Sequence, residues 1–244
     1  FAASELDRRL GIEIDRACVR RWAIKEKLQH VQYVKKARAA VRRWQCSEVG
    51  ALWQLDASSH NWFGEYAPKT ALLDMIDDCS RVITGARLYT RESLLSYMDF
   101  LPRTFEEYGL PLILYVDYHS FFFSQNPEVL TCLGRALKFY DISLKYAPTP
   151  QAKGKIERHH LFWQNRLPPL FIIEKISDVM SANTLIDMLR PHHNQKEIHR
   201  EINSTPASAW EDAIHNGRSV LRAVPKCPWG KYIWSVRSSV TVDS

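Results

Sequence analysis

From Ala51 onward, short apolar runs alternate with longer segments in which apolar residues recur at helical spacing. Five runs have the composition and flanking turn residues of β-strands: Leu52–Asp56, Thr70–Asp77, Arg81–Tyr89, Leu112–Val116 and Ile142–Tyr146. The second and third flank Asp78-Cys-Ser80 and are expected to form an antiparallel hairpin, whereas Ser58–Gly64 is expected to be a loop. Helical periodicity predicts three helices among these strands: Glu92–Tyr108, which Pro102 should kink, Glu128–Tyr140, and Gln151 to Arg166.

The first thirty residues have a different pattern of helix, turn and basic helix. Residues 2–10 predict a short helix that ends at Gly11, and Asp15 is a suitable N-cap for a second helix reaching about Leu28. The segment is expected to have a small apolar core and three outward-facing arginines: Leu6, Leu10, Ile12, Val19 and Trp22 inside, and Arg16, Arg20 and Arg21 outside. This order is typical of helix-turn-helix segments that bind DNA, although many helical hairpins bind nothing.

Positive charge is concentrated at the N-terminal end of the chain. Residues 1–50 contain 12 Lys and Arg against 6 Asp and Glu, whereas residues 51–244 contain 21 of each kind. A basic segment attached to a near-neutral domain is typical of nucleic-acid binding, with a solvated charged surface as the alternative. Residues 31–50 are interpreted as a basic linker that either follows DNA phosphates or is simply solvated.

After Pro168-Pro169, which are expected to stop the preceding helix, the sequence predicts a helical extension. Residues 182–189 are apolar at helical spacing, and His192-His193-Asn194 is expected to lead into a polar bend. Thr205 is expected to cap a further helix with Pro206 at its first position. The predicted organisation is a helix-turn-helix segment, a linker, an α/β core, a helical extension and the start of a small β-module: 1–30, 31–50, 51–168, 169–218 and 219–244.

Size and composition are those of a globular protein with a substantial core. No run of about 18 apolar residues occurs, so no membrane span is expected. The cysteines are odd in number and lack zinc or redox spacing, which favours reduced thiols: Cys18, Cys46, Cys79, Cys132 and Cys227. The chain begins at Phe1 rather than Met, which leaves open that it is part of a longer protein.

Three acidic residues stand out by their position in these predicted elements. Asp56 and Asp117 each follow a short apolar strand directly or form its last residue. Glu157 is the one acid between Gln151 and Arg166, in a predicted helix that is otherwise basic. A single carboxylate among cations suits a site that holds a metal ion against a polyanion.

These three acids, with the string Pro150-Gln-Ala-Lys-Gly-Lys-Ile-Glu-Arg158, resemble the DDE transposases of bacterial insertion sequences and the related retroviral integrases. The likeness covers nearly the whole chain. It implies an α/β, ribonuclease-H-like fold, a mixed five-stranded sheet with helices on both faces, preceded by the helix-turn-helix segment. The order of elements alone fits several α/β folds, and the placement of the acids favours this one.

The resemblance implies that Asp56, Asp117 and Glu157 are catalytic and hold two Mg²⁺ ions, with Mn²⁺ as another possible metal. Asp56 would bridge both ions, Asp117 would hold one and Glu157 the other. The ions would activate the attacking oxygen and stabilise the leaving oxygen during DNA cleavage at the element ends and strand transfer into target DNA. No covalent protein–DNA bond is implied, so no Ser, Tyr or Cys nucleophile is required.

Several other residues are candidates for roles near this site. The cations beside Glu157 are the favoured DNA contacts in the core: Lys153, Lys155 and Arg158. His119 is either an active-site neighbour or a packed side chain. Asp77 and Asp78 are most simply the start of the hairpin turn, and a metal role for them or for Asp74 is the less favoured alternative. Phe121–Phe123 are interpreted as core, with base stacking as the alternative.

The resulting prediction is a DDE-type transposase that acts on element ends and target DNA as a homodimer or larger synaptic assembly. The resemblance implies a location in the bacterial cytoplasm, on the nucleoid during action. A metal-dependent nuclease of the same fold is one alternative, because it would cut DNA without joining it. A catalytically silent DNA-binding protein derived from a transposase is the other. The sequence does not indicate which terminal repeat is recognised, which target site is preferred, or whether this copy is active.

Overall fold

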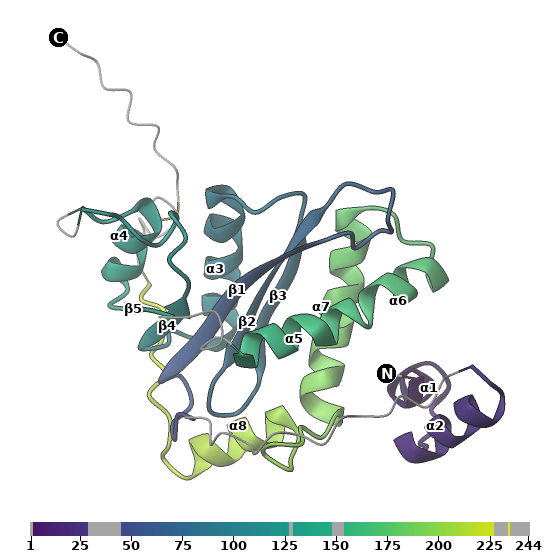
Figure 1. Ribbon diagram of the computed structural model, residues 1–244. Helices are drawn as coiled ribbons and strands as arrows, with labels where there is room; N and C mark the ends of the chain where they lie inside the picture. The colour runs from purple at the N-terminus through teal and green to yellow at the C-terminus, as the bar shows by residue number, and fades with distance from the viewer. Residues whose placement is uncertain (1, 29–44, 127–128, 148–153, 227–233, 235–244) are drawn as a thin grey trace. The chain divides into compact units, whose positions relative to one another are not determined.

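The structure is a computed structural model that describes residues 2–28, 45–126, 129–147, 154–226 and 234, apart from the side chains of Lys155 and Glu157. The chain divides into two compact units, residues 1–45 and 46–244. The larger unit contains a five-stranded mixed sheet with helices on both faces, as the sequence predicts (Figure 1). Among the described residues, no helix is both long and apolar enough to span a membrane.

The sheet has the strand order β3-β2-β1-β4-β5. Its strands have these bounds: β1 Leu52–His60, β2 Thr70–Asp77, β3 Ile83–Tyr89, β4 Ile113–Val116 and β5 Ser143–Tyr146. The first three pair as an antiparallel meander, and β4 and β5 are added in parallel on the other side of β1. The central strand β1 is therefore flanked by one antiparallel and one parallel neighbour.

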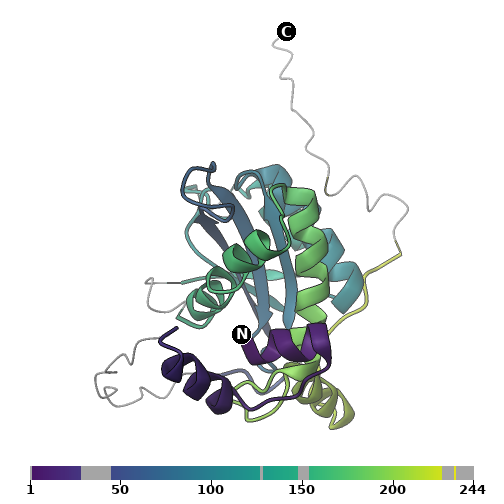
Figure 2. The same ribbon diagram turned by 90° about the vertical axis from the view of Figure 1, so that its right-hand side faces the viewer.

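Alternation of side chains along β1 and β2 gives the sheet two different faces. Trp53 and Leu55 of β1 pack with Leu73 and Met75 of β2 in a core that α3 (Leu94–Tyr108) and α4 (Cys132–Phe139) cover. The opposite face carries Leu72 and packs against the remaining core helices: α5 (Gly154–Gln164), α6 (Leu167–Ile173) and α7 (Val179–Lys196). In Figure 2, α7 runs alongside β3.

Capping side chains determine where several of these helices begin. Ser93 and Thr131 accept hydrogen bonds from backbone N–H groups at the starts of α3 and α4. Thr205 caps α8 (Pro206–His215) by accepting from Ser208 N at 3.2 Å, as predicted. Pro102 lies inside α3, again as the sequence indicates.

The smaller unit contains two helices, α1 (Ala2–Leu10) and α2 (Arg16–Lys25). Gly11 follows α1 with a φ of +66°, and Asp15 caps α2 by accepting from Ala17 N at 2.7 Å. The predicted apolar core of this segment is wrong in part, because Leu10, Ile12 and Trp22 are 65%, 47% and 54% exposed. Two short helices present too few facing apolar side chains to bury all of them.

Three local predictions differ from the structure. β1 continues through Ser58–His60, which was expected to be loop, because these residues pair with Thr70–Leu72 of β2. The helix before Pro168-Pro169 ends at Gln164, short of Arg166, and the two prolines lie in the first turn of α6, where a missing N–H is tolerated. His192-His193-Asn194 does not bend but belongs to α7, with Asn194 Nδ2 and Oδ1 bonded to the backbone of Ile83.

The ends of the larger unit are partly described. Most of the predicted linker lies outside the described residues, but its last part packs into the larger unit, where Val49 is fully buried and forms a bridge with Ser219. Arg222 forms a second bridge with Leu110. The predicted β-module at 219–244 lies mainly outside the described residues, and the domain boundaries stay a prediction.

Candidate active site

The register of the sheet brings Asp56 and Asp117 to neighbouring positions. Gln54 of β1 pairs with Tyr115 of β4 in parallel, and the two aspartates each follow their paired residue by two positions. Side chains two residues further along adjacent strands lie on the same face of the sheet. Asp56 is half-buried, and Asp117, just beyond the end of β4, is exposed. Both carboxylates are thus accessible from one edge of the sheet.

Helix α5 lies against this face through two consecutive histidines. Asp56 pairs with Asp74 across β1 and β2, so their carboxylates share a face. His159 Nδ1 is hydrogen-bonded to Asp74 Oδ2, and His160 Nδ1 lies 3.7 Å from Asp56 Oδ2. Glu157 precedes His160 by three residues, which places the two residues on the same side of α5. The backbone of the third predicted acid is therefore on the helix that covers Asp56.

A buried tyrosine, Tyr97, lies near enough to both aspartates for their charges to affect its pKa. Tyr97 of α3 is 2% exposed, and its hydroxyl donates to Glu92 Oε1 at 2.8 Å. Burial raises the pKa of Tyr97 well above its ordinary value, and the charges of Glu92, Asp56 and Asp117 raise it further. Both predicted catalytic aspartates are therefore close enough to act on one phenol, which stays protonated as a donor.

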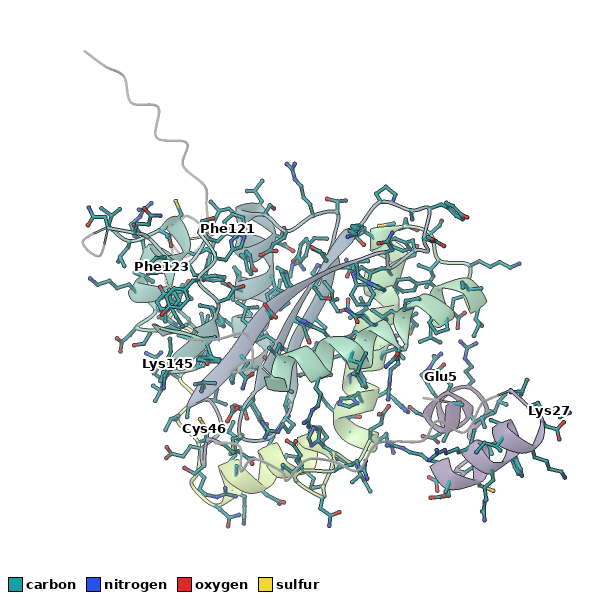
Figure 3. The ribbon with its side chains drawn as sticks, viewed as in Figure 1. Glu5, Lys27, Cys46, Phe121, Phe123 and Lys145 are labelled. Carbon is teal, nitrogen blue, oxygen red and sulfur yellow. The ribbon has the colours of Figure 1, made fainter. Side chains whose placement is uncertain are left out.

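The loop after β4 is packed rather than extended into solvent. Asp117 accepts a hydrogen bond from His119 N at 3.1 Å. The His119 ring lies 4.4 Å from the ring of Phe121, and its Nδ1 accepts from Phe121 N. Figure 3 shows Phe121 and Phe123 on this loop, near α4. Phe121 also packs on Tyr97, so the loop and the tyrosine form one aromatic cluster beside Asp117.

Two further aspartates have structural partners. Asp77 is fully buried and accepts hydrogen bonds from Gly50 N, Trp53 Nε1 and the N–H and hydroxyl of Ser80. Asp78 accepts from Gln54 Nε2 at 2.7 Å and Cys46 N at 2.8 Å. These bonds fit the interpretation of both residues as part of the hairpin turn.

The predicted DNA contacts have different surroundings. Arg158 is exposed on α5 and pairs with Glu201 at 2.7 Å. Lys155 lies on the first turn of α5, but its side chain is outside the described part of the chain, as is the whole of Lys153. The three arginines of α2 are exposed, as expected: Arg16, Arg20 and Arg21.

Sequence reasoning missed the residues that surround the acids. His160 lies beside Asp56, Asp74 pairs with Asp56 across the strands and binds His159, and the charges of both aspartates act on Tyr97. Asp74 was considered only as a less favoured metal ligand. Its place beside Asp56 depends on which residues of β1 and β2 pair with each other. Within the described ranges, which exclude the Glu157 side chain, no three His, Cys, Asp or Glu side chains form a metal-ligand cluster.

Solved structures with the same fold are retroviral integrase catalytic cores. The catalytic core of HTLV-2 integrase, in complex with magnesium, aligns with a TM-score of 0.52 at 17% identity over 69% of this chain and 99% of its own. A chain of the simian T-cell lymphotropic virus intasome aligns with a TM-score of 0.56 at 15% identity over 93% of this chain and 78% of its own. The larger unit therefore has the ribonuclease-H-like fold of these integrase cores.

Sequence comparison identifies the branch of this class. The transposase for insertion sequence IS1202 of Streptococcus pneumoniae is 34% identical over 174 residues, and a Sinorhizobium fredii protein named as a transposase, y4bF, is 27% identical over 222 residues. These matches cover 68% and 84% of this chain but only 36% and 48% of the relatives. No family model matches the chain. The chain is a relative of the insertion-sequence transposases, built on the integrase-core fold.

Proposed function

We propose that the chain is the catalytic part of a DDE transposase that cleaves DNA at element ends and joins those ends to target DNA. The observation that supports it most directly is the meeting of Asp56 and Asp117 at one edge of adjacent strands, beneath the helix that carries Glu157. The similarity to insertion-sequence transposases supports the joining reaction over simple cleavage.

The chemistry of these side chains fits a divalent cation. Mg²⁺ prefers carboxylate oxygens and is usually held by one or two of them together with waters and substrate phosphates. Asp56 and Asp117 are accessible carboxylates on one side of the sheet, and we propose that Glu157 completes the set. Bound divalent cations, of which we propose two, would stabilise charge on the attacking and leaving oxygens of an in-line displacement. The HTLV-2 core, which has the same fold, is in complex with magnesium.

The remaining residues position these acids and the DNA. We propose that His160, which lies beside Asp56, helps to position that carboxylate. We propose DNA contacts by the basic side chains of α2 and of the start of α5: Arg16, Arg20, Arg21, Lys153, Lys155 and Arg158. His119 is proposed to orient Asp117 through its backbone N–H rather than to contact DNA.

We also propose a dimer or larger assembly that holds two element ends together. The HTLV-2 core occurs in dimeric and trimeric forms, and a further structure of the same fold is part of an intasome. Joining two ends to one target requires that two active sites be held at a fixed separation. Action on bacterial DNA would place the chain on the nucleoid.

A strand-transfer assay with Asp56→Asn tests the proposed function. The protein is incubated with Mg²⁺, labelled duplexes carrying the ends of its own element, and a circular target. We expect the variant to lose cleavage and joining by at least about 10³-fold, since loss of one catalytic group commonly costs this much. DNA affinity, measured by fluorescence anisotropy, should stay within about twofold of the unsubstituted chain.

Asp212→Asn is the matched control, because Asp212 is exposed on α8 and the substitution removes the same charge. It should retain full activity. Cleavage without joined product would instead favour the nuclease alternative. Binding of the element ends without any cleavage, in both the unsubstituted chain and the control, would favour the silent DNA-binding protein.

A further inference from the structure

A small cavity lies beside α5, lined by the apolar side chains of Ile76 and Phe162 together with several polar ones. It has a volume of about 140 Å³ and lies between α5, the β2–β3 turn and the segment after α7. This is several times the ~30 Å³ that one water occupies in the liquid, so it can hold a small tetrahedral ion. The polar residues that line it are Arg81, Arg158, His159, His193, His199 and Glu201. Five of these six carry nitrogen and only one carries a carboxylate.

Three nitrogens of the lining residues are buried without a hydrogen-bond partner, on Arg81, His159 and His193, although His193 Nδ1 lies 3.2 Å from Glu197 Oε2. Arg81 is 3% exposed, and its Nε atom has no partner. Its other nitrogens donate to Asp78 O at 2.6 Å and reach Glu201 Oε2 at 3.4 Å. His159 is 8% exposed, and its Nε2 has no partner because its Nδ1 is used by Asp74. Buried polar atoms of this kind are rare and usually indicate a missing partner such as water or an ion.

The one carboxylate of the cavity bridges its two arginines. Glu201 Oε1 lies 2.7 Å from Arg158 Nη1, and Oε2 lies 3.4 Å from Arg81 Nη2. Burial would raise the pKa of Glu201, but the two arginines lower it below its ordinary value. Glu201 lies in a turn after α7, and its side chain is 36% exposed, so it can swing outward without disturbing the core.

Two arginines face the cavity, and Arg81 also lies 3.6 Å from the Asp78 carboxylate. Burial lowers the pKa of His199 to about 4, and the charge of Arg81 contributes to this shift. His199 Nδ1 accepts a hydrogen bond from Glu201 N, so the proton of the neutral ring is on Nε2, where it is a further donor. Arginines, a histidine donor and desolvation are the features by which proteins bind oxyanions.

We propose that this cavity binds a phosphate group, and that Glu201 holds the place of that anion in the free chain. The phosphate would take over the contacts of Glu201 with Arg81 and Arg158 and would satisfy the Arg81 Nε. It comes either from the backbone of bound DNA or from free phosphate. Only the first case rests on the proposed DNA-joining function, because free phosphate would bind whether or not the chain joins DNA.

Titration with inorganic phosphate tests the proposal without any catalytic readout. Binding to the unsubstituted chain and to Glu201→Gln is followed by calorimetry and by the ¹⁵N resonances of the His159 and His199 rings. We expect roughly tenfold tighter binding to Glu201→Gln, since the anion no longer competes with a charge-assisted carboxylate. Arg158→Gln should weaken binding by a similar factor. Sulfate should displace phosphate, and chloride should not.

Glu211→Gln is the matched control, because Glu211 is exposed on α8 and does not line the cavity. It should bind phosphate as the unsubstituted chain does. The proposal is overturned if phosphate leaves both histidine resonances unmoved in Glu201→Gln, or if Glu201→Gln and Glu211→Gln bind it equally.

A parallel titration with DNA distinguishes the two sources of the phosphate group. A short duplex without element sequences is titrated into the same variants. Tighter duplex binding by Glu201→Gln than by Glu211→Gln indicates a backbone phosphate in the cavity. Tighter binding of inorganic phosphate alone indicates a site for the free ion. Either result supports the anion site, whereas a loss of strand transfer by Asp56→Asn concerns only the joining reaction.

Discussion

At the scale of single residues, the aspartates of the sheet are of two kinds. Asp77 is fully buried and its two oxygens accept four hydrogen bonds from neighbouring donors. Asp56 and Asp117 are accessible and lie beside each other at a strand edge. A carboxylate whose acceptors are already occupied stabilises the fold, whereas an accessible one can accept a cation.

Asp77→Asn should therefore reduce stability and not chemistry. The amide nitrogen of asparagine cannot accept a hydrogen bond, so two of the buried donors around it lose their partner. We expect the free energy of unfolding to fall by about 2–3 kcal/mol. Urea unfolding followed by tryptophan fluorescence measures this loss. Asp56→Asn is the comparison. Because Asp56 is half-buried, this substitution should lower the free energy of unfolding by less than about 1 kcal/mol. Equal losses in the two variants would contradict this division of roles.

The three acids could be predicted as residues, but their surroundings could not. Asp56 and Asp117 follow apolar strands, and this local pattern is visible in the sequence. His159 and His160 are adjacent in sequence yet face Asp74 and Asp56 on two different strands. Which strand each histidine contacts depends on the position of α5 on the sheet. Local sequence patterns do not predict that position.

At the scale of elements, an ion pair joins the helices that cover the second face of the sheet. Arg166, between α5 and α6, donates to both oxygens of Glu197 at 2.5 and 2.6 Å. Glu197 follows the end of α7, and His193 Nδ1 lies 3.2 Å from it. Burial would raise the pKa of Glu197, but hydrogen bonds from His193 and Arg166 hold it well below its ordinary value.

Glu197→Gln should destabilise the chain by about 3 kcal/mol at pH 7, since it leaves the charge of Arg166 without its buried partner. A carboxyl whose pKa is lowered by folding stabilises the protein above its unfolded pKa of 4.5 and loses this contribution as the pH falls. The difference in free energy of unfolding between the variant and the unsubstituted chain should therefore become smaller from pH 7 to pH 3. Denaturant unfolding at both values measures it, and a constant difference would contradict the assignment.

Helix boundaries were harder to predict where tertiary contacts override local signals. Pro168-Pro169 were expected to end a helix but begin α6, because a proline that breaks one helix is equally suited to the first turn of the next. The polar residue Asn194 was expected in a bend but is buried in α7, where it replaces a backbone partner for Ile83. Thr205 was predicted correctly because a cap depends on the next three residues alone.

At the scale of the whole molecule, the charge of the chain is unevenly distributed between its two compact units. The excess of positive charge lies within residues 1–50, and the rest of the chain is balanced. Such an arrangement separates a general attraction to the DNA backbone from the chemistry of the core. The exposed arginines of α2 are the described part of this basic segment: Arg16, Arg20 and Arg21.

Replacing Arg16, Arg20 and Arg21 together by Gln should weaken DNA binding and make it less dependent on salt. Each lost phosphate contact reduces the slope of log affinity against log salt by roughly 0.9. Fluorescence anisotropy between about 50 and 200 mM salt measures both quantities. Strand transfer at saturating DNA should change much less than affinity, because the proposed catalytic acids are in the other unit.

A second triple variant controls for the loss of net charge. Lys138, Lys175 and Lys196 are exposed in the larger unit, and their replacement by Gln removes the same three charges. This variant should keep the salt dependence of the unsubstituted chain. An equal change in the two triple variants would mean that total charge, and not the α2 surface, controls binding.

The sequence by itself determined the order of the five strands and the charged N-terminal segment and indicated the three acids as candidates, because each depends on neighbouring residues along the chain. Only the tertiary structure decided that Asp56 and Asp117 share one strand edge, that α5 places its histidines over Asp56 and Asp74, and that Glu201 joins Arg81 and Arg158. These features depend on strand register and helix placement, and both are established when distant apolar faces of the chain pack together.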